Sequence, residues 1–280
     1  MTAAMSSATS EPAAMIGLSR DSEEFRTDTH RLAQFARAVD DANPRHLSGE
    51  IAPPVFAHVP VMQSMVEVLG RITPAFILHG EHDFVFHEPI VPGQRLFSVS
   101  TLQGIRGTRA GTVFIVRSDT TTHDGRLVCS QYSGCLLPGE RHEDAGEPVP
   151  ERPAPERGAT SSERYALSPD QTRRYADAAR DYSAYTIDPA AAAKAGFPAP
   201  IVHGMCTLAF ASRAIVDNHC GGDTRRLKRF GCRFTGPLLM TPGQELTVVH
   251  WSGGATGVGF EATDSEGTAV IRNGYAEIEP

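Results

Sequence analysis

Residues suited to acid–base chemistry stand at two places in this 280-residue chain. The first is the run Asp41-Ala42-Asn43-Pro44-Arg45-His46, which holds a carboxylate and an imidazole close together. The second combines Asp181 with the turn His203-Gly204-Met205, which opens an apolar segment. Carboxylates and imidazoles are common proton donors and acceptors in enzymes, and the start of a helix carries a partial positive charge that attracts anions. Both places are therefore candidates for a catalytic site.

The elements that must position these residues repeat along the chain. Each half shows a polar helical segment, an Asp-containing loop, an apolar helix and several strands with a Pro-Gly turn. The segment from Met205 to Val216 has no Gly or Pro and its apolar spacing predicts a buried central helix. Alternating segments after it predict antiparallel hairpins. We therefore predict an α+β protein built by internal duplication, in which each half is a curved antiparallel sheet around a central helix.

The predicted halves are separated by a segment rich in Pro, Gly and charge, which is the composition of an exposed linker. We predict a disordered tail at residues 1–15, an N-terminal domain at 16–138, a linker at 139–163 and a C-terminal domain at 164–280.

Composition excludes several classes of partner. A net charge of -7 without a basic stripe argues against nucleic acid. The five cysteines form no CxxC pair, which suits free thiols in a reducing cytosol rather than a zinc site. His79, His82 and His87 lack carboxylates at ligand spacing, which favours surface or cavity positions over metal binding. The N-terminus lacks the pattern of a signal peptide and no apolar run is long enough to span a membrane. We expect a cytoplasmic protein without metal.

The second half resembles the MaoC-like hydratases, also called (R)-specific enoyl-CoA hydratases or hydratase 2. The resemblance is carried by Ala193-Lys194-Ala195-Gly196-Phe197, Pro200-Ile201-Val202-His203-Gly204-Met205-Cys206-Thr207, Arg233-Phe234, Pro237 and Pro242-Gly243-Gln244, and more loosely in the first half by Asn43-Pro44, Ala52-Pro53-Pro54 and Pro92-Gly93. It implies a double hot-dog fold and a hydratase or dehydratase of α,β-unsaturated or 3-hydroxy acyl thioesters of CoA or a carrier protein. It also implies a role in fatty-acyl, polyketide or specialised biosynthesis, no cofactor, and further assembly into a homodimer.

Members of this family resemble one another in carrying Asp and His in the pattern D-x-N-P-x-H. Counted back from Gly196-Phe197, these positions fall on Asp181, Ser183 and Thr186, so the histidine is missing. A threonine hydroxyl cannot replace an imidazole, whose ordinary pKa is about 6.5. The resemblance assigns the base to Asp181, for which a loop-capping carboxylate is the alternative.

The same resemblance assigns the thioester oxygen to a backbone N–H at the start of the central helix. The turn His203-Gly204 fits this role because glycine lets a ligand approach the helix start, although close helix packing would also select glycine. Tyr182 and Tyr185 flank the loop as candidate phenolic donors.

The first half carries the opposite set of residues. Asp41, Asn43 and His46 stand at the family spacing and form an alternative catalytic set, although an Asn-Pro pair also ends helices. Where the helix should open with His-Gly we expect His58-Val59, and a branched Cβ at Val59 would block the thioester. The resemblance therefore implies that this half shelters the acyl chain.

The negatively charged carrier of the acyl group has one candidate binding site, the basic cluster Arg225, Arg226, Lys228 and Arg229. Of these, Arg226 and Lys228 are our candidates for pairing with CoA phosphates or an acidic carrier protein, and a solvated turn is the alternative.

Two other functions stay open. The loss of the imidazole at Thr186 suits a non-hydrating lyase, isomerase or cyclase, and a non-catalytic acyl-binding subunit would also keep the fold.

Overall fold

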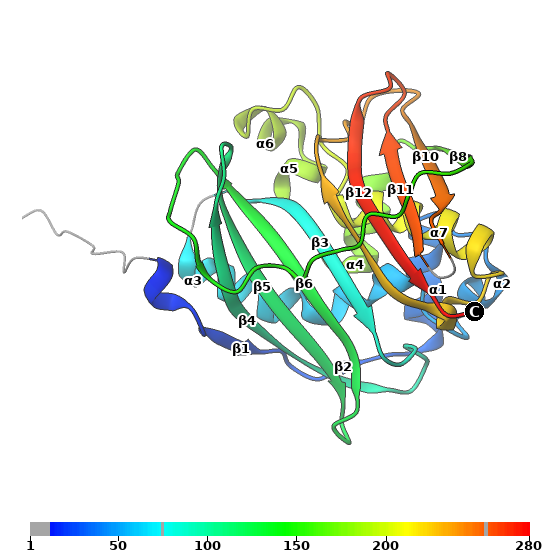
Figure 1. The fold of residues 1–280 in the computed structure, drawn as a ribbon, viewed down its shortest axis with the longest axis horizontal. Helices are drawn as coiled ribbons and strands as arrows, with labels where there is room; N and C mark the ends of the chain where they lie inside the picture. The colour runs from blue at the N-terminus through cyan, green and yellow to red at the C-terminus, as the bar shows by residue number, and fades with distance from the viewer. Residues whose placement is uncertain (1–11, 74–75, 255–256) are drawn as a thin grey trace, which may run out of the picture.

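The computed structural model describes residues 12–73, 76–254 and 257–280, and their strands form one large antiparallel sheet (Figure 1). The order across the sheet is β1 (Ser19–Asp21), β4 (Arg95–Gly107), β5 (Gly111–Thr122), β6 (Leu127–Pro138), β3 (Leu78–Phe86), β9 (Leu227–Phe234), β12 (Ala269–Ile278), β11 (Gly257–Thr263), β10 (Glu245–Ser252) and β8 (Thr160–Ala166). Two short strands, β2 (Phe25–Arg26) and β7 (Ala145–Gly146), pair with β4.

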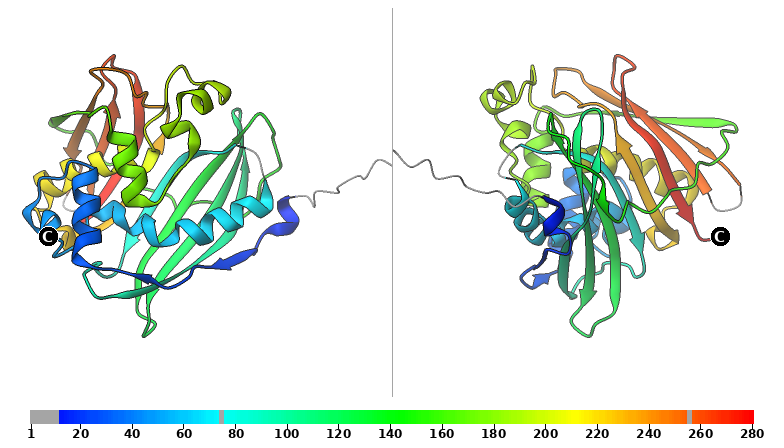
Figure 2. Two further views of the ribbon diagram at one scale, coloured as in Figure 1. Left: turned by 180° about the vertical axis from the view of Figure 1, so that it is seen from behind. Right: turned by 60° about the vertical axis from the view of Figure 1, so that its left-hand side comes forward.

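The helices pack together on one face of this curved sheet (Figure 2). The central helix of the second half is α7 (Gly204–His219), and that of the first half is the 3₁₀ segment η2 (Pro54–Val61) continued by α3 (Met62–Ile72). The remaining helical segments are η1 (Pro12–Met15), α1 (Thr29–Ala38), α2 (Pro44–Leu47), α4 (Gln171–Ala179), α5 (Ala184–Ile187), α6 (Pro189–Lys194) and η3 (Thr224–Arg226). The predicted helix at Met205–Val216 is confirmed, and α7 is buried along most of its length.

The two halves join edge to edge through β3 and β9. The pairing is antiparallel, with Glu81 opposite Arg233 at one end and Val85 opposite Arg229 at the other. The buried Asp83 faces Gly231 across this seam and accepts hydrogen bonds from the guanidinium of Arg229. The double hot-dog architecture expected from the sequence is confirmed, with the two expected sheets fused into one.

The described residues bear on the segments at the domain ends. Residues 1–11 of the expected tail lie outside the described residues, whereas Pro12–Met15 form η1 and Met15 packs against the core beneath α3. Strand β8 begins at Thr160, inside the expected linker, and the side chain of Arg152 lies 3.5 Å from Glu81.

No helix within the described ranges is long and apolar enough to cross a membrane.

Candidate active site

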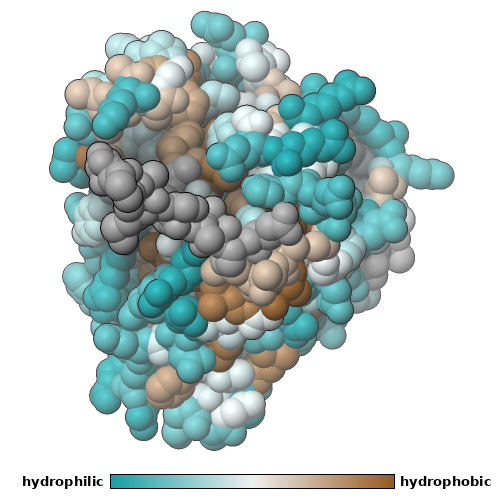
Figure 3. All heavy atoms as spheres, turned by 90° about the vertical axis from the view of Figure 1, so that its left-hand side faces the viewer, coloured by the Kyte–Doolittle hydropathy of each residue, from teal (hydrophilic) through white to brown (hydrophobic). Residues whose placement is uncertain are grey.

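A cavity of about 380 Å³ lies between α3 and the N-terminal end of α7. Its walls come from both halves: Met62, Met65, Val66 and Leu69 of α3, residues 77–80 at the start of β3, the loops that hold Asp181 and His203, and Phe234 at the end of β9. The volume is ordinary for a small-molecule site. On the side of the molecule where α3 lies, apolar side chains gather between hydrophilic margins (Figure 3). The cavity therefore suits an apolar ligand with a polar end.

Asp181 enters this cavity from a loop whose geometry is set locally. Helix α4 ends at Arg180, which adopts the left-handed conformation (φ 58°) and turns the chain. Oδ1 of Asp181 then accepts hydrogen bonds from the backbone N–H (3.1 Å) and hydroxyl (2.6 Å) of Ser183. These two bonds orient the carboxylate and leave its second oxygen for the cavity.

Thr186 and His203 connect this loop to the start of α7. The buried hydroxyl of Thr186 donates to the carbonyl of Ser183 (2.6 Å) and lies 2.9 Å from Nε2 of His203. That nitrogen also lies 3.1 Å from the carbonyl oxygen of Asp181, and because a carbonyl only accepts, Nε2 carries the hydrogen. Burial lowers the pKa of His203, so the ring is neutral. Its buried Nδ1 finds no hydrogen-bond partner among the residues that the structure describes. His203 therefore links the loop of Asp181 to the start of α7 through the contacts of its Nε2.

Gly204 is the first residue of α7, and its predecessor His203 provides no side-chain cap. The backbone N–H groups of the first turn therefore lack intrahelical partners and can meet a negative oxygen. A Cβ added at Gly204 would meet Phe234 at 3.4 Å and His79 at 3.5 Å, which is ordinary contact distance with side chains. Close helix packing therefore does not require this glycine, and the space it leaves belongs to the cavity.

Two histidines of the first half, which the sequence did not place at this site, also line the cavity. Nδ1 of His58 lies 3.0 Å from Oε1 of Gln131, and Nε2 of His79 lies 3.1 Å from Nδ1 of His82. Burial lowers the pKa values of all three imidazoles. Nothing in the local spacing of His58 signals this position, because Gln131 and the residues that share the cavity with it lie far away in the sequence, many of them in the other half.

Comparison with known proteins matches each half of the chain to a known protein family. Residues 151–273 match the family described as MaoC like domain, and residues 14–131 match the FAS1-like, dehydratase domain region. The chain belongs to the MaoC-like family. A MaoC-like dehydratase from Phytophthora capsici superposes with a TM-score of 0.82 at 25% identity, covering 95% of this chain and 97% of that one.

Curated relatives of this MaoC-like chain carry related names. "Peroxisomal multifunctional enzyme type 2" of Drosophila melanogaster is 30% identical over 209 residues, which are 72% of this chain and 34% of the relative. "Probable enoyl-CoA hydratase 2" of Dictyostelium discoideum is 28% identical over 231 residues, covering 78% of this chain and 77% of the relative. The MaoC-like chain thus spans about a third of the first relative's length.

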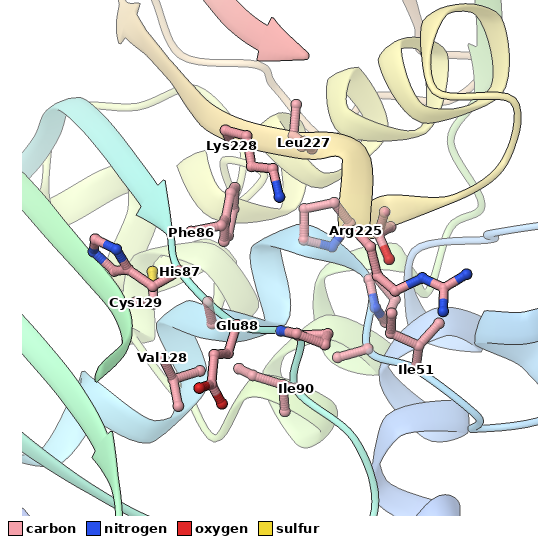
Figure 4. Close-up of a pocket in the computed structure, with 16 residues that line it drawn as sticks. Ile51, Phe86, His87, Glu88, Ile90, Val128, Cys129, Arg225, Leu227 and Lys228 are labelled. Carbon is pink, nitrogen blue, oxygen red and sulfur yellow. The ribbon is translucent and has the colours of Figure 1, made fainter. Parts of the chain in front are cut away.

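The alternative residues of the first half are not in the lining of the cavity that holds Asp181. Nδ1 of His46 lies 2.6 Å from Oδ2 of Asp41, and both side chains are buried. The side-chain amide of Asn43 donates to the carbonyl of Gly222 at 2.8 Å. A smaller cavity of about 130 Å³ lies between the two halves, lined by Ile51, Phe86 and Ile90 of the first half and Leu227 of the second among others, and Asp41, Asn43 and His46 are not in its lining (Figure 4). Asp41, Asn43 and His46 are therefore buried, and Asn43 links the first half to the second.

The expected helix opening at His58-Val59 is wrong. The backbone N–H of Ala52 donates to Ile90 O (2.9 Å) just as that of Val202 donates to Leu238 O (2.8 Å), so Pro53-Pro54 occupies the place of His203-Gly204. Segment η2 accordingly begins at Pro54, which has no N–H to offer an oxygen. The obstacle to an oxyanion site in the first half is therefore proline and not the Cβ of Val59.

Of the remaining predicted residues, Tyr185 and Lys228 line a cavity, whereas Tyr182 and Arg226 line neither. Tyr185 lines the larger cavity, and burial raises the pKa of its phenol to about 12, whereas Tyr182 is 62% exposed. Lys228 lines the smaller cavity, with its ammonium 2.7 Å from Glu279, and Arg226 donates to the backbone carbonyl of Glu279 (Figure 4). Of the basic cluster, Arg225 and Lys228 line the smaller cavity, and none of its four residues is in the lining of the cavity that holds Asp181.

Within the described ranges, no group of three or more His, Cys, Asp or Glu side chains is arranged to hold a metal ion.

Proposed function

We propose that this MaoC-like chain is a hydro-lyase that interconverts an α,β-unsaturated acyl thioester and its 3-hydroxy derivative, using the larger cavity. One observation carries the proposal: His203 joins the carboxylate-bearing loop of Asp181 to the open helix start at Gly204, so both face one apolar cavity. Relatives named "Enoyl-CoA hydratase ChsH3" and "3-hydroxyacyl-thioester dehydratase Y" support this reaction class over a non-hydrating lyase, isomerase or cyclase, or a non-catalytic subunit.

Each part of the site has a chemical task. In the hydration direction the free oxygen of Asp181 accepts a proton from a water molecule, while the oxygen of that water adds to Cβ of the enoyl thioester. Electrons move onto the thioester oxygen, which the N–H groups at the start of α7 hold as an enolate. A proton must then reach Cα from a second group. In the dehydration direction every step reverses.

The first half supplies an apolar wall for the acyl chain. Met62, Met65 and Leu69 of α3 present apolar side chains to the cavity that begins at Gly204. We propose that the chain of the substrate lies along α3 while its thioester meets α7.

The decisive experiment incubates the purified protein with crotonyl-CoA and with a longer 2-enoyl-CoA, follows the enoyl absorbance and identifies products by mass. Gain of one water is the expected result. The proposal is overturned when neither the enoyl thioesters nor the 3-hydroxyacyl thioesters in the reverse assay change. Tight binding of those thioesters without turnover would instead indicate an acyl-binding subunit.

We further propose that CoA or a carrier protein delivers the acyl group in biosynthesis, and that the domains are residues 16–138 and 164–280. A cytoplasmic location is supported by the five cysteines, which are all buried and unpaired. A homodimer is supported by β1 and β8, the end strands of the described sheet path, since such edges invite pairing. Light scattering tests the dimer.

A further inference from the structure

If the cavity carries out the proposed reaction, the loop and helix start beside Asp181 do not supply a second proton-transfer group. Thr186 uses its hydrogen on the carbonyl of Ser183 and receives the N–H of His203. The remaining nitrogen of His203, Nδ1, is buried out of reach of a ligand and has no partner within the described ranges. Neither side chain is therefore free to exchange a proton with a substrate, and this inference rests on the proposed function.

The other titratable side chains in the lining are His58, His79, Cys135 and Tyr185. Burial raises the pKa values of Cys135 and Tyr185 to about 12 each, so neither exchanges protons readily near neutral pH. Nε2 of His79 is engaged by His82, whose Nδ1 also lies 3.2 Å from the hydroxyl of Ser133. His58 is left as the best-placed group.

The tautomer of His58 follows from its neighbour Gln131. The side-chain amide of Gln131 donates through Nε2 to the carbonyl of Ala57 at 2.9 Å, which fixes which end of the amide is oxygen. Oε1 of Gln131 then faces Nδ1 of His58 at 3.0 Å, so Nδ1 carries the hydrogen. Nε2 of His58 keeps its lone pair, and His58 lines the cavity. This is the arrangement of an oriented imidazole base.

Charge couples His58 to Asp181. Burial lowers the pKa of His58, and the negative charge of Asp181 acts in the opposite direction by favouring the imidazolium. The imidazole is therefore neutral at rest, and its charged form is stabilised by the other proposed proton-transfer group. Segment η2, which carries His58, packs against α7, so the ring reaches the cavity from the opposite domain.

We propose that His58 supplies the imidazole that position 186 lacks. In dehydration, Nε2 of His58 removes the α-proton of the 3-hydroxyacyl thioester and the electrons pass to the carbonyl oxygen at α7. The enolate electrons then re-form the carbonyl and make the Cα–Cβ double bond as the Cβ–O bond breaks, and the protonated carboxyl of Asp181 gives its proton to the leaving hydroxide, which departs as water. The imidazolium and carboxylate that result exchange one proton through solvent, and hydration runs the same steps backwards.

The test compares His58→Gln with His82→Gln. The ring of His82 lies 5.1 Å from that of His58, but His82 does not line the cavity, so it controls for the effect of altering the buried histidine cluster. His58→Gln is expected to lower kcat by about 10²- to 10⁴-fold, the usual contribution of a positioned proton-transfer group. His82→Gln is expected to stay within about threefold. Added imidazole is expected to restore part of the activity of His58→Ala.

A wild-type enzyme that turns over while His58→Gln keeps its rate would overturn this inference and leave the proposed function standing. A wild-type protein inactive on every thioester would instead overturn the function itself. If His58 variants do not fold, Gln131→Glu provides the second measurement. A carboxylate beside Nδ1 raises the imidazole pKa, so the acidic limb of the kcat profile for dehydration, in which His58 acts as the base, is expected to move to higher pH. An unmoved limb contradicts the role of His58.

Discussion

The hydroxyl oxygen of Thr186 lies 2.9 Å from Nε2 of His203, and the residues at the corresponding positions of the first half are His46 and Pro53. At these two positions the order of side-chain sizes is therefore reversed between the halves. In the second half the larger ring stands at the helix start and the small residue stands on the loop. The imidazole of His203 therefore lies directly against Thr186, the residue at the position of the missing histidine.

Replacing Asp181 with asparagine is expected to lower kcat by about 10²- to 10⁴-fold. The amide oxygen of asparagine can still accept from the backbone N–H of Ser183, so the fold should persist. Steady-state kinetics with a 2-enoyl-CoA and a thermal melt check both statements. Asp188→Asn is the matched control, because Asp188 caps exposed α6 and asparagine caps equally well. Equal rates in the two variants would remove Asp181 from the mechanism.

Replacing Thr186 with histidine is expected to destabilise the protein by about 1–3 kcal/mol, because the 1% exposed site is already filled by the ring of His203. The double variant Thr186→His/His203→Ala should recover much of that loss by making room. Urea unfolding of the wild type, both single variants and the double variant gives the coupling free energy. Additive effects would show that the two positions do not share this space.

Replacing Gly204 with alanine places a methyl group in the cavity beside the free N–H groups of α7. Because the new Cβ meets only side chains, at 3.4 Å or more, the fold should be retained while kcat/KM falls by about 10²-fold or more. Gly70→Ala is the control, since Gly70 is an exposed glycine of α3 with nothing near its Cβ position. Similar kinetics for both variants would exclude the oxyanion role.

Replacing His46 with alanine is expected to affect stability and leave catalysis unchanged. Removing the imidazole deprives the buried carboxyl of Asp41 of a partner at 2.6 Å, which costs about 1–3 kcal/mol in addition to the lost packing. The measurements are the free energy of unfolding and kcat/KM per folded molecule. A stable variant with a strongly reduced rate would move the active site to the first half.

The free energy of unfolding should fall as the pH drops below about 6.5. Burial lowers the pKa values of His58, His82 and His203 in the folded state, so between those values and the ordinary pKa the unfolded chain binds more protons. Each such histidine contributes a slope of up to about 1.4 kcal/mol per pH unit. Urea unfolding at several pH values measures it, and His82→Gln should reduce the slope by one histidine's share.

Much of the second-half site follows from local sequence. The loop of Asp181, Ser183 and Thr186 has the conformation of the loop at Asp41, because in both a backbone N–H two residues on donates to the aspartate. Such short contacts depend on spacing alone. The buried helix after Gly204 and the alternating strands are likewise local patterns, and they suffice to predict two hot-dog domains.

The helix start of the first half could not be found in this way. Its position is set by the hydrogen bond between Ala52 and Ile90, residues far apart in sequence, and the sequence pattern pointed to His58 instead. That histidine has a different place, which depends on Gln131 of β6 and on the packing of η2 against α7.

The family, the duplicated fold and the loss of the motif histidine can all be predicted from the amino-acid sequence, because residue types at short, regular spacing carry them. Which side chains share the cavity of Asp181 is known only from the packed molecule, since His58 reaches that cavity from the opposite domain. Contacts between domains depend on how the two halves of the sheet and the two central helices pack, and no local periodicity specifies that arrangement.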